Sequence, residues 1–236
     1  MQRHFNSCFH RKKKIAYKKY GVAEGLPEEY VGGMLQDDQG FIWLTTQNGL
    51  VKYDGYDFKV YKEVKNETDS STVQLGNLNK GIIKTKEGKF WMGHFNNGEI
   101  FYFDPSTERG RSFKPQFKDS PEIHTTFVEV LFEDAQKNIW FINHAQDTLV
   151  LARFNPKTEI SRAYPYEKTF GNTLLGFQNL VQSRKDGTIW YIERSGNLKI
   201  WTPENDDFEL VLSFSEKIPG TQINDTLISL NTLNND

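Results

Sequence analysis

The chain has 236 residues, of which 14% are aromatic and 25% charged, and its formal net charge is −2. The first 20 residues hold seven basic residues and no acidic one, so the other 216 carry 22 basic and 31 acidic residues, a net charge of −9. An acidic body argues against a nucleic-acid-binding surface, which needs clustered positive charge. No apolar run is long enough to span a bilayer, and a single cysteine, Cys8, excludes an intrachain disulfide and a cysteine metal cluster.

The N-terminal segment divides into two predicted parts. Residues 1–14 are basic and are expected to be disordered. No apolar stretch of seven or more residues follows them, so this N-terminus does not encode a signal peptide. Ile15–Val22 is prone to form a strand that ends at Gly25-Leu26-Pro27, and it fits the outermost strand of a blade that closes a ring.

Four tryptophans at nearly equal spacing organise the rest of the chain. They are 48, 49 and 50 residues apart, and each lies between a polar turn and a short β-prone run: Trp43, Trp91, Trp140 and Trp190. Repetition at this period is typical of propellers built from four-stranded antiparallel blades. We therefore predict an all-β propeller domain over residues 15–236, with blades at about 28–64, 77–118, 124–167 and 174–215.

The first unit shows how strands and turns alternate. Its strand candidates are Tyr30–Gln36, Phe41–Thr46, Leu50–Tyr53 and Asp57–Tyr61. Gln47-Asn48-Gly49 is predicted to be a tight hairpin turn, since Asn-Gly tolerates positive φ at both central positions. Asp54 suits the following turn because its side chain can bond local backbone.

The later units repeat this order with some changes. Gly88 and Gly187 precede their tryptophans as Gly40 does, whereas the third unit has Asn138, which also tolerates a left-handed turn. The fourth strand of the second unit is predicted at Arg111–Phe117. Residues 221–236 have the pattern of the first strand of a fifth blade, so about four complete blades plus part of another are expected, in an incomplete ring. The alternative is a four-bladed ring with frayed ends.

The repeated residues are interpreted as structural. A tryptophan in every unit is expected to fill the space between neighbouring blades, with about a few kcal/mol of apolar burial each, rather than to stack on sugars. Each glycine permits a turn.

Residues 20–55 carry the most specific pattern. Its elements are Gly25-Leu26-Pro27, Val31, Gln36-Asp37, Gly40-Phe41-Ile42-Trp43, Thr46, Asn48-Gly49-Leu50 and Tyr53-Asp54-Gly55. This pattern closely resembles the two-component regulator propeller repeats in the periplasmic sensor region of hybrid histidine kinases from Bacteroidetes-type bacteria. The later units retain less of it, and the third and fourth keep little beyond Ile-Trp.

The resemblance implies a non-enzymatic sensor in signal transduction. It implies a periplasmic location, a small-molecule or oligosaccharide ligand, and partners in the form of further blades and a kinase of a longer chain. The sequence itself holds no ATP-binding segment, no phosphoacceptor helix and no cofactor motif.

Polar residues near the predicted ends of the second strands are the candidate ligand-binding set. They are expected to project on one face of the disc: Gln47, His94, Asn96, His144 and Arg194. The alternative is that they only cap turns and contact water. A metal site at His94 and His144 is not predicted, because the spacing places no carboxylate beside them.

A propeller enzyme is the alternative function. Streptogramin lyases and gluconolactonase-like proteins also carry Gly-x-Ile-Trp repeats, and residues 186–190 look similar. The lyase pattern has shorter repeats and a central pair of histidines, and the lactonase pattern has metal-binding carboxylates. Neither is visible, so no catalytic residue is predicted. A WD-repeat scaffold is a weaker third option, since its Trp-Asp pair falls where this chain has Tyr53-Asp54.

Overall fold

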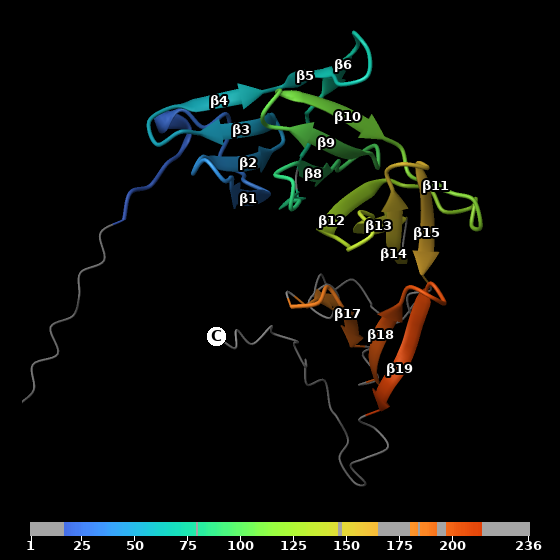
Figure 1. Cartoon of the computed structure of the whole chain (residues 1–236). Coiled ribbons are helices and arrows are strands. Elements are labelled where there is room, and N and C mark those ends of the chain that lie inside the picture. The colour runs from blue at the N-terminus through green and yellow to red at the C-terminus, as the bar shows by residue number, and fades with distance from the viewer. Residues whose placement is uncertain are drawn as a thin grey trace, which may run out of the picture.

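A computed structural model describes residues 17–78, 80–145, 148–164, 180–183, 185–192 and 197–213. Within these residues the regular structure is β-strand, apart from one 3-10 turn, and the strands form four sheets that follow one another in chain order (Figure 1). This confirms the predicted all-β class. No helix in the described ranges is long and apolar enough to cross a membrane. Residues 1–14 and 221–236, which carry the predictions of a disordered N-terminus and a fifth blade, lie outside the described residues.

The first and fourth sheets are antiparallel meanders of four strands. The first contains β1 (Gly33–Gln36), β2 (Ile42–Thr46), β3 (Gly49–Tyr53) and β4 (Phe58–Tyr61). The fourth contains β16 (Leu180–Gln182), β17 (Ile189–Ile192), β18 (Asn197–Thr202) and β19 (Asp207–Ser213). In both, consecutive strands pair, as the alternation of strands and turns predicts.

The second sheet has six strands and is larger than predicted. Its blade consists of β7 (Lys80–Lys84), β8 (Phe90–Gly93), β9 (Ile100–Asp104) and β10 (Arg109–Phe113). A hairpin of β5 (Glu63–Asn66) and β6 (Thr72–Gln74) extends it, with β5 parallel to β10. The sequence prediction leaves residues 65–76 without a strand. The hairpin forms there because Val64 and Val73 alternate with polar neighbours and are buried in the core.

The third sheet has five strands, and one of them, β11 (Gln116–Phe117), comes from the second predicted unit. It contains β12 (Phe127–Glu133), β13 (Ile139–Ala145), β14 (Thr148–Asn155), β15 (Ile160–Tyr164) and β11, which pairs parallel to β15. The prediction of a single strand over Arg111–Phe117 is therefore wrong. Pro115 cannot donate to a strand ladder, and Phe117 is buried against the third sheet, so the chain crosses to that sheet.

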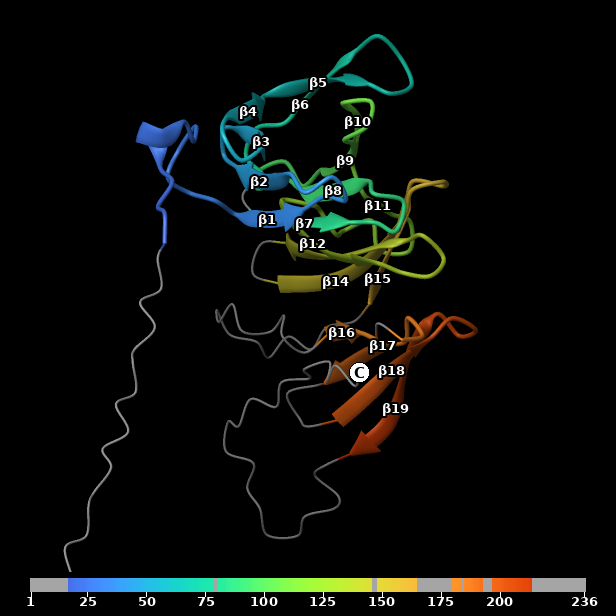
Figure 2. The same cartoon turned by 60° about the vertical axis from the view of Figure 1, so that its left-hand side comes forward.

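The segment before the first sheet is not a strand in its described part. Val22–Glu24 form a 3-10 turn, in which the Glu24 carboxylate accepts from the Gly21 N–H at 2.7 Å and Gly25 closes the turn at φ 104°. The prediction of a closing strand at Ile15–Val22 is therefore wrong over residues 17–22. This segment instead packs on the first sheet (Figure 2), where Leu26 is buried.

The turns before the tryptophans have the left-handed residue that the glycines predict. Gly40, Gly88 and Gly187 have φ of 91°, 76° and 77°. In the third blade the equivalent residue is Lys137 (φ 69°), so the assignment of this role to Asn138 is wrong. The Asn138 amide instead donates to the Asp134 carboxylate at 3.0 Å.

The β2–β3 hairpin also differs in detail from its prediction. The turn consists of Gln47 and Asn48, and Gly49, the first residue of β3, is the one with positive φ (131°). A Cβ atom at Gly49 would lie 2.4 Å from the Tyr61 carbonyl oxygen. Glycine is needed here because the end of β4 passes directly over it.

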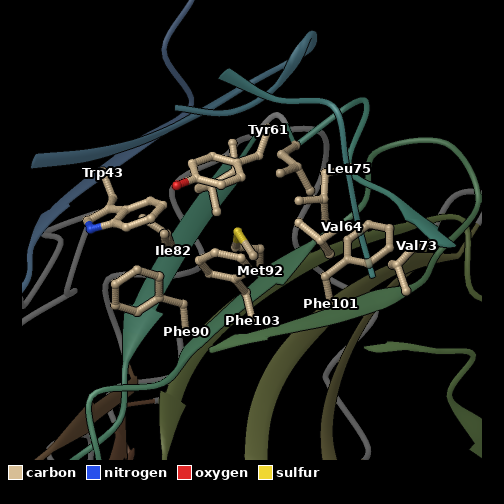
Figure 3. Close-up of a cluster of buried hydrophobic side chains, with 12 residues drawn as sticks. Trp43, Tyr61, Val64, Val73, Leu75, Ile82, Phe90, Met92, Phe101 and Phe103 are labelled. Atoms are coloured by element: carbon tan, nitrogen blue, oxygen red, sulfur yellow. The ribbon is translucent and has the colours of Figure 1, made fainter. Parts of the chain in front are cut away.

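Three of the four tryptophans, Trp43, Trp91 and Trp140, lie between neighbouring blades. Trp43 is fully buried and contacts Tyr61 of its own blade and Phe90 and Phe103 of the next, with ring centroids 5.6, 5.2 and 5.4 Å away (Figure 3). The next two boundaries repeat this packing with the pairs Trp91–Phe113, Trp91–Phe154, Trp140–Tyr164 and Trp140–Trp201. Trp190 is half-buried.

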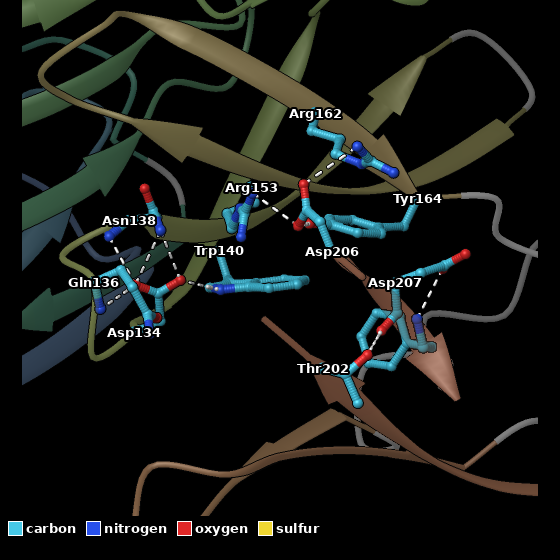
Figure 4. A network of polar contacts seen from close by, with 11 residues as sticks. Asp134, Gln136, Asn138, Trp140, Arg153, Arg162, Tyr164, Thr202, Asp206 and Asp207 are labelled. Carbon is cyan, nitrogen blue, oxygen red and sulfur yellow. Dashed lines mark hydrogen bonds and ion pairs between the residues drawn. The ribbon is translucent and has the colours of Figure 1, made fainter. Parts of the chain in front are cut away.

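Aspartates six residues before two of the tryptophans fix the indole rings. Trp43 Nε1–H donates to Asp37 at 2.7 Å, and Trp140 Nε1–H donates to Asp134 at 3.0 Å (Figure 4). The other oxygen of each carboxylate accepts backbone N–H groups of the same turn. One carboxylate thus shapes the turn and orients the tryptophan.

A repeated ionic contact, here called the rim contact, joins the fourth strands of successive blades. In each contact, a basic residue on the fourth strand of one blade pairs with an acidic residue of the next blade. The acidic residue directly precedes the fourth strand of its own blade and has a positive φ. The pairs are Lys59–Glu108 at 2.8 Å, Arg111–Glu159 at 2.8 Å and Arg162–Asp206 at 3.2 Å. Tyr61 and Tyr164 also donate their hydroxyls to Glu108 and Asp206. Each acid follows a Pro-x-x spacing that the sequence shows at 105–108, 156–159 and 203–206.

Candidate functional site

The β2–β3 turn and the β8–β9 turn lie near each other on one face of the molecule, here called the hairpin face. Backbone hydrogen bonds tie them to the next blade: Leu78 N–H donates to the Thr46 carbonyl at 3.0 Å, and Val128 N–H donates to the His94 carbonyl at 3.2 Å. Beside the first of these bonds, Asn77 N–H donates to the Gln47 carbonyl at 2.7 Å. The backbone of this face is therefore fixed from blade to blade.

A cleft of about 720 Å³ opens on this face between the first and second blades. The β2–β3 turn, the β5–β6 hairpin and the β8–β9 turn form its walls. Its lining residues include six side-chain amides (Gln47, Asn48, Asn66, Gln74, Asn77 and Asn97) and three hydroxyls (Ser71, Thr72 and Ser112). Lys62 and Glu99 are its charged residues, so the cleft is polar and nearly neutral.

His94 is held in one tautomer at the edge of the cleft. Its Nδ1 accepts the N–H groups of Asn96 at 3.0 Å and Asn97 at 3.1 Å, so Nδ1 carries no proton and the neutral ring carries it on Nε2. Burial lowers the pKa of His94, and nearby Lys114 lowers it further against the opposing effect of Glu99. His94 therefore caps its own turn and leaves Nε2–H as a hydrogen-bond donor.

The four predicted residues that the structure describes do not come together as one set. Gln47 and His94 line the cleft, whereas Asn96 is exposed on the same turn as His94 but does not line it. His144 lies on the third blade, where its ring stacks on Phe127 at 4.2 Å, and Phe127 in turn contacts Phe95 at 4.9 Å. Arg194 lies outside the described residues.

Sequence reasoning missed the wall that the β5–β6 hairpin supplies. Asn66, Ser71, Thr72 and Gln74 line the cleft from this hairpin. Two short alternating runs around a polar turn, at 63–66 and 72–75, were the available signal. Among the described residues, no group of three or more His, Cys, Asp or Glu is arranged to hold a metal ion.

One repeat of the chain matches a family model. The model for the two-component regulator propeller covers residues 25–48, from the segment before β1 to the β2–β3 turn. Residues 25–48 are a two-component regulator propeller repeat. This regulator repeat contributes Gln47 and Asn48 to the cleft.

Solved structures support the propeller fold around the regulator repeat. The extracellular domain of BT4673 from B. thetaiotaomicron, assigned to the one-component or hybrid two-component systems, is 16% identical and has a TM-score of 0.56 over 87% of this chain and 27% of that chain. Virginiamycin B lyase from Staphylococcus aureus, in complex with quinupristin, is 14% identical with a TM-score of 0.50 over 79% of this chain and 56% of that chain. At such identities the likeness establishes the fold.

A sequence relative among curated proteins is the MATH and LRR domain-containing protein PFE0570w of Plasmodium falciparum. It is 21% identical over 199 residues, which make up 83% of this chain but 2% of that protein. The chain thus spans 2% of this relative and 27% of the BT4673 extracellular domain.

Proposed function

We propose that this chain is a non-enzymatic ligand-recognition propeller, part of the extracytoplasmic sensor of a hybrid two-component system. The observation that carries the proposal is the regulator repeat at residues 25–48, whose hairpin turn forms one wall of the polar cleft. The partners would be further blades and a kinase of a longer chain, and the location would be the periplasm.

The ligand proposed for the cleft is an uncharged oligosaccharide. Amides and hydroxyls both donate and accept hydrogen bonds, as sugar hydroxyls do, and one base and one acid leave the cleft close to neutral. The Nε2–H of His94 adds a donor of fixed tautomer. An anionic ligand would need a cluster of bases, which this lining does not offer.

A lyase-like activity is the weaker alternative. A general base needs a free lone pair within reach of the substrate, and the Nδ1 lone pair of His94 is used by two backbone N–H groups. His144 stacks on Phe127 on another blade and does not line the cleft with His94.

Calorimetric titration of the full chain with a panel of neutral oligosaccharides tests the proposal. At least one member should bind, and Gln47→Ala should weaken that binding about three- to tenfold, because a hydrogen bond to the ligand is lost. Asn96→Ala is the matched control, since this exposed amide on the neighbouring turn does not line the cleft. No binding by any sugar, or equal losses for both variants, would contradict the proposal.

A further inference from the structure

The turn before the second tryptophan lacks the aspartate that the first and third turns have. Thr85 stands six residues before Trp91, where Asp37 and Asp134 stand before their tryptophans. The backbone is the same in all three: residue −6 donates its N–H to the carbonyl of residue −2, at 3.0, 2.8 and 2.9 Å in the first, second and third blades. Thr85 Oγ1 also accepts the Lys89 N–H at 3.1 Å, as the aspartates do in their turns. The turn is thus preserved, and only the carboxylate is replaced.

The indole of Trp91 is placed like those of the other two tryptophans. It contacts the fourth-strand aromatic of its own blade, Phe113, and the third-strand aromatic of the next blade, Phe154, at 5.6 and 6.2 Å. Trp91 is only 5% exposed. Yet no group in the described part of the chain accepts a hydrogen bond from its Nε1–H, the bond that Asp37 and Asp134 accept in their blades. The ring of Trp91 is therefore packed between the blades, while its Nε1–H has no acceptor within the described residues.

The residue opposite Trp91 on the third strand also differs from its counterparts. Lys52 is opposite Trp43 and Arg153 is opposite Trp140, whereas Tyr102 is opposite Trp91. Burial raises the pKa of Tyr102 to about 12, so its hydroxyl stays protonated. That hydroxyl, too, has no hydrogen-bond partner among the described residues. Two polar groups without partners thus stand side by side on adjacent strands.

Both groups line one cavity on the face opposite the hairpin face. The cavity has a volume of about 360 Å³ and lies between the β7–β8 turn and the turns of the third blade. Thr85, Trp91 and Tyr102 form one wall, and Glu133 and Lys137 stand across from them.

The charges around this cavity leave one base available. Lys89 pairs with Asp104 at 2.6 Å, and Lys137 pairs with both Glu87 and Glu133. Lys157 lines the cavity, is exposed, and has no ion pair in the part of the chain that the structure describes. It can therefore meet an anion without breaking an existing pair.

We propose that this cavity binds a small carboxylate, whose oxygen accepts from Trp91 Nε1–H at the place that the side chains of Asp37 and Asp134 take in their blades. The Tyr102 hydroxyl donates a second hydrogen bond, and Lys157 supplies the countercharge. The carboxylate can belong to a uronic acid or to an acylated amino acid, which both fit this volume. This site lies on the other face from the proposed oligosaccharide cleft and does not depend on it.

Indole ¹⁵N–¹H NMR of the full chain tests the site directly. Sodium acetate is the probe, sodium chloride at equal ionic strength is the control, and Trp91→Phe assigns the resonance. The Trp91 signal should shift and saturate with acetate, while the signals of Trp43 and Trp140 stay fixed, because their Nε1–H groups already have carboxylate acceptors. Galacturonate and N-acetylglycine titrations then identify the source, by which of the two binds more tightly.

Thr85→Asp provides the matched variant, because it restores the aspartate of the other blades. It should abolish the acetate response and raise the midpoint of thermal unfolding. An absent or non-saturating Trp91 shift, or equal shifts with chloride, would overturn the proposal. So would an acetate response that persists in a folded T85D chain. If T85D did not fold, the Trp91 response of the unmodified chain would decide alone.

Discussion

The boundaries between blades are held in two different ways at their core and at their rim. Around each buried tryptophan, aromatic rings of two blades pack together, and Trp43 and Trp140 are fully buried. At the rim contact, Lys59 and Glu108 meet while their side chains remain 58% and 44% exposed. Buried apolar contacts contribute several kcal/mol each, whereas exposed ion pairs contribute little. We therefore expect stability to come from the core, and selectivity for the correct neighbour to come from the rim.

The largest effect is expected where two blades approach most closely in the core. A Cβ atom at Gly93 would lie 1.9 Å from the Val128 carbonyl oxygen of the next blade. Gly93→Ala should therefore force the blades apart and lower the free energy of unfolding by about 3 kcal/mol or more. Chemical denaturation measures this.

Gly55→Ala is the control for that experiment. Gly55 has φ 103° but nothing within 4 Å of its added Cβ, so only backbone strain of about 1 kcal/mol is expected. Equal losses for the two variants would show that close packing between blades is not what limits stability.

A medium effect is expected at the carboxylate that supports the core. Asp134 is 4% exposed and accepts from Trp140, Asn138 and the turn backbone. Asp134→Ala leaves several buried donors without an acceptor and should cost about 2–3 kcal/mol. Asp37→Ala, at a more exposed turn, should cost less when both variants are measured by chemical denaturation. A larger loss of stability for Asp37→Ala than for Asp134→Ala would contradict the idea that burial of the carboxylate determines the loss.

The smallest effect is expected at the rim. Lys59 and Tyr61 lower the pKa of Glu108 by donating hydrogen bonds to its carboxylate. A carboxyl whose pKa is lower in the folded chain stabilises it above the usual glutamate pKa, and this stabilisation fades as the pH falls through the folded value. Glu108→Gln should therefore cost no more than about 1 kcal/mol at pH 7.

The pH dependence of unfolding separates this rim effect from a packing defect. The difference between Glu108→Gln and the unmodified chain should shrink as the pH falls below the ordinary glutamate value of 4.5. A difference that stayed constant from pH 7 to pH 3 would assign the cost to packing instead of charge.

Sequence reasoning predicted the elements whose signal is local. The tryptophan spacing, the left-handed glycines and the polar turns each depend on a few adjacent residues, and the four blades follow from them. It failed where the partner of a strand decides its place: Pro115 indicates a break in the strand, but nothing in the sequence nearby indicates that Phe117 is buried against the third sheet. The β5–β6 hairpin was missed for a different reason: its alternating runs are only four and three residues long, so their local signal is weak.

The candidate site was predictable in part for the same reason. The position of Gln47 and His94 after the second strands follows from the repeat, and both line the cleft. The tautomer of His94, the place of His144 on another blade and the cavity beside Trp91 depend on contacts between blades. The sequence shows Thr85 where the first and third turns have aspartate. Only the structure shows that this replacement leaves the Nε1–H of the buried Trp91 without an acceptor among the described residues.

The rim contacts also make the two edges of a blade different in charge. At each described boundary the earlier blade offers a base and the later blade offers an acid, so two blades exchanged in order would not meet unlike charges in the same way. In the fourth blade, the residue in register with Lys59, Arg111 and Arg162 is Glu209, opposite Ile200. A circularly permuted or shuffled chain that set an acid-bearing blade against this strand would bring two carboxylates together. The charges at the two edges of a blade therefore favour one order of neighbouring blades over others.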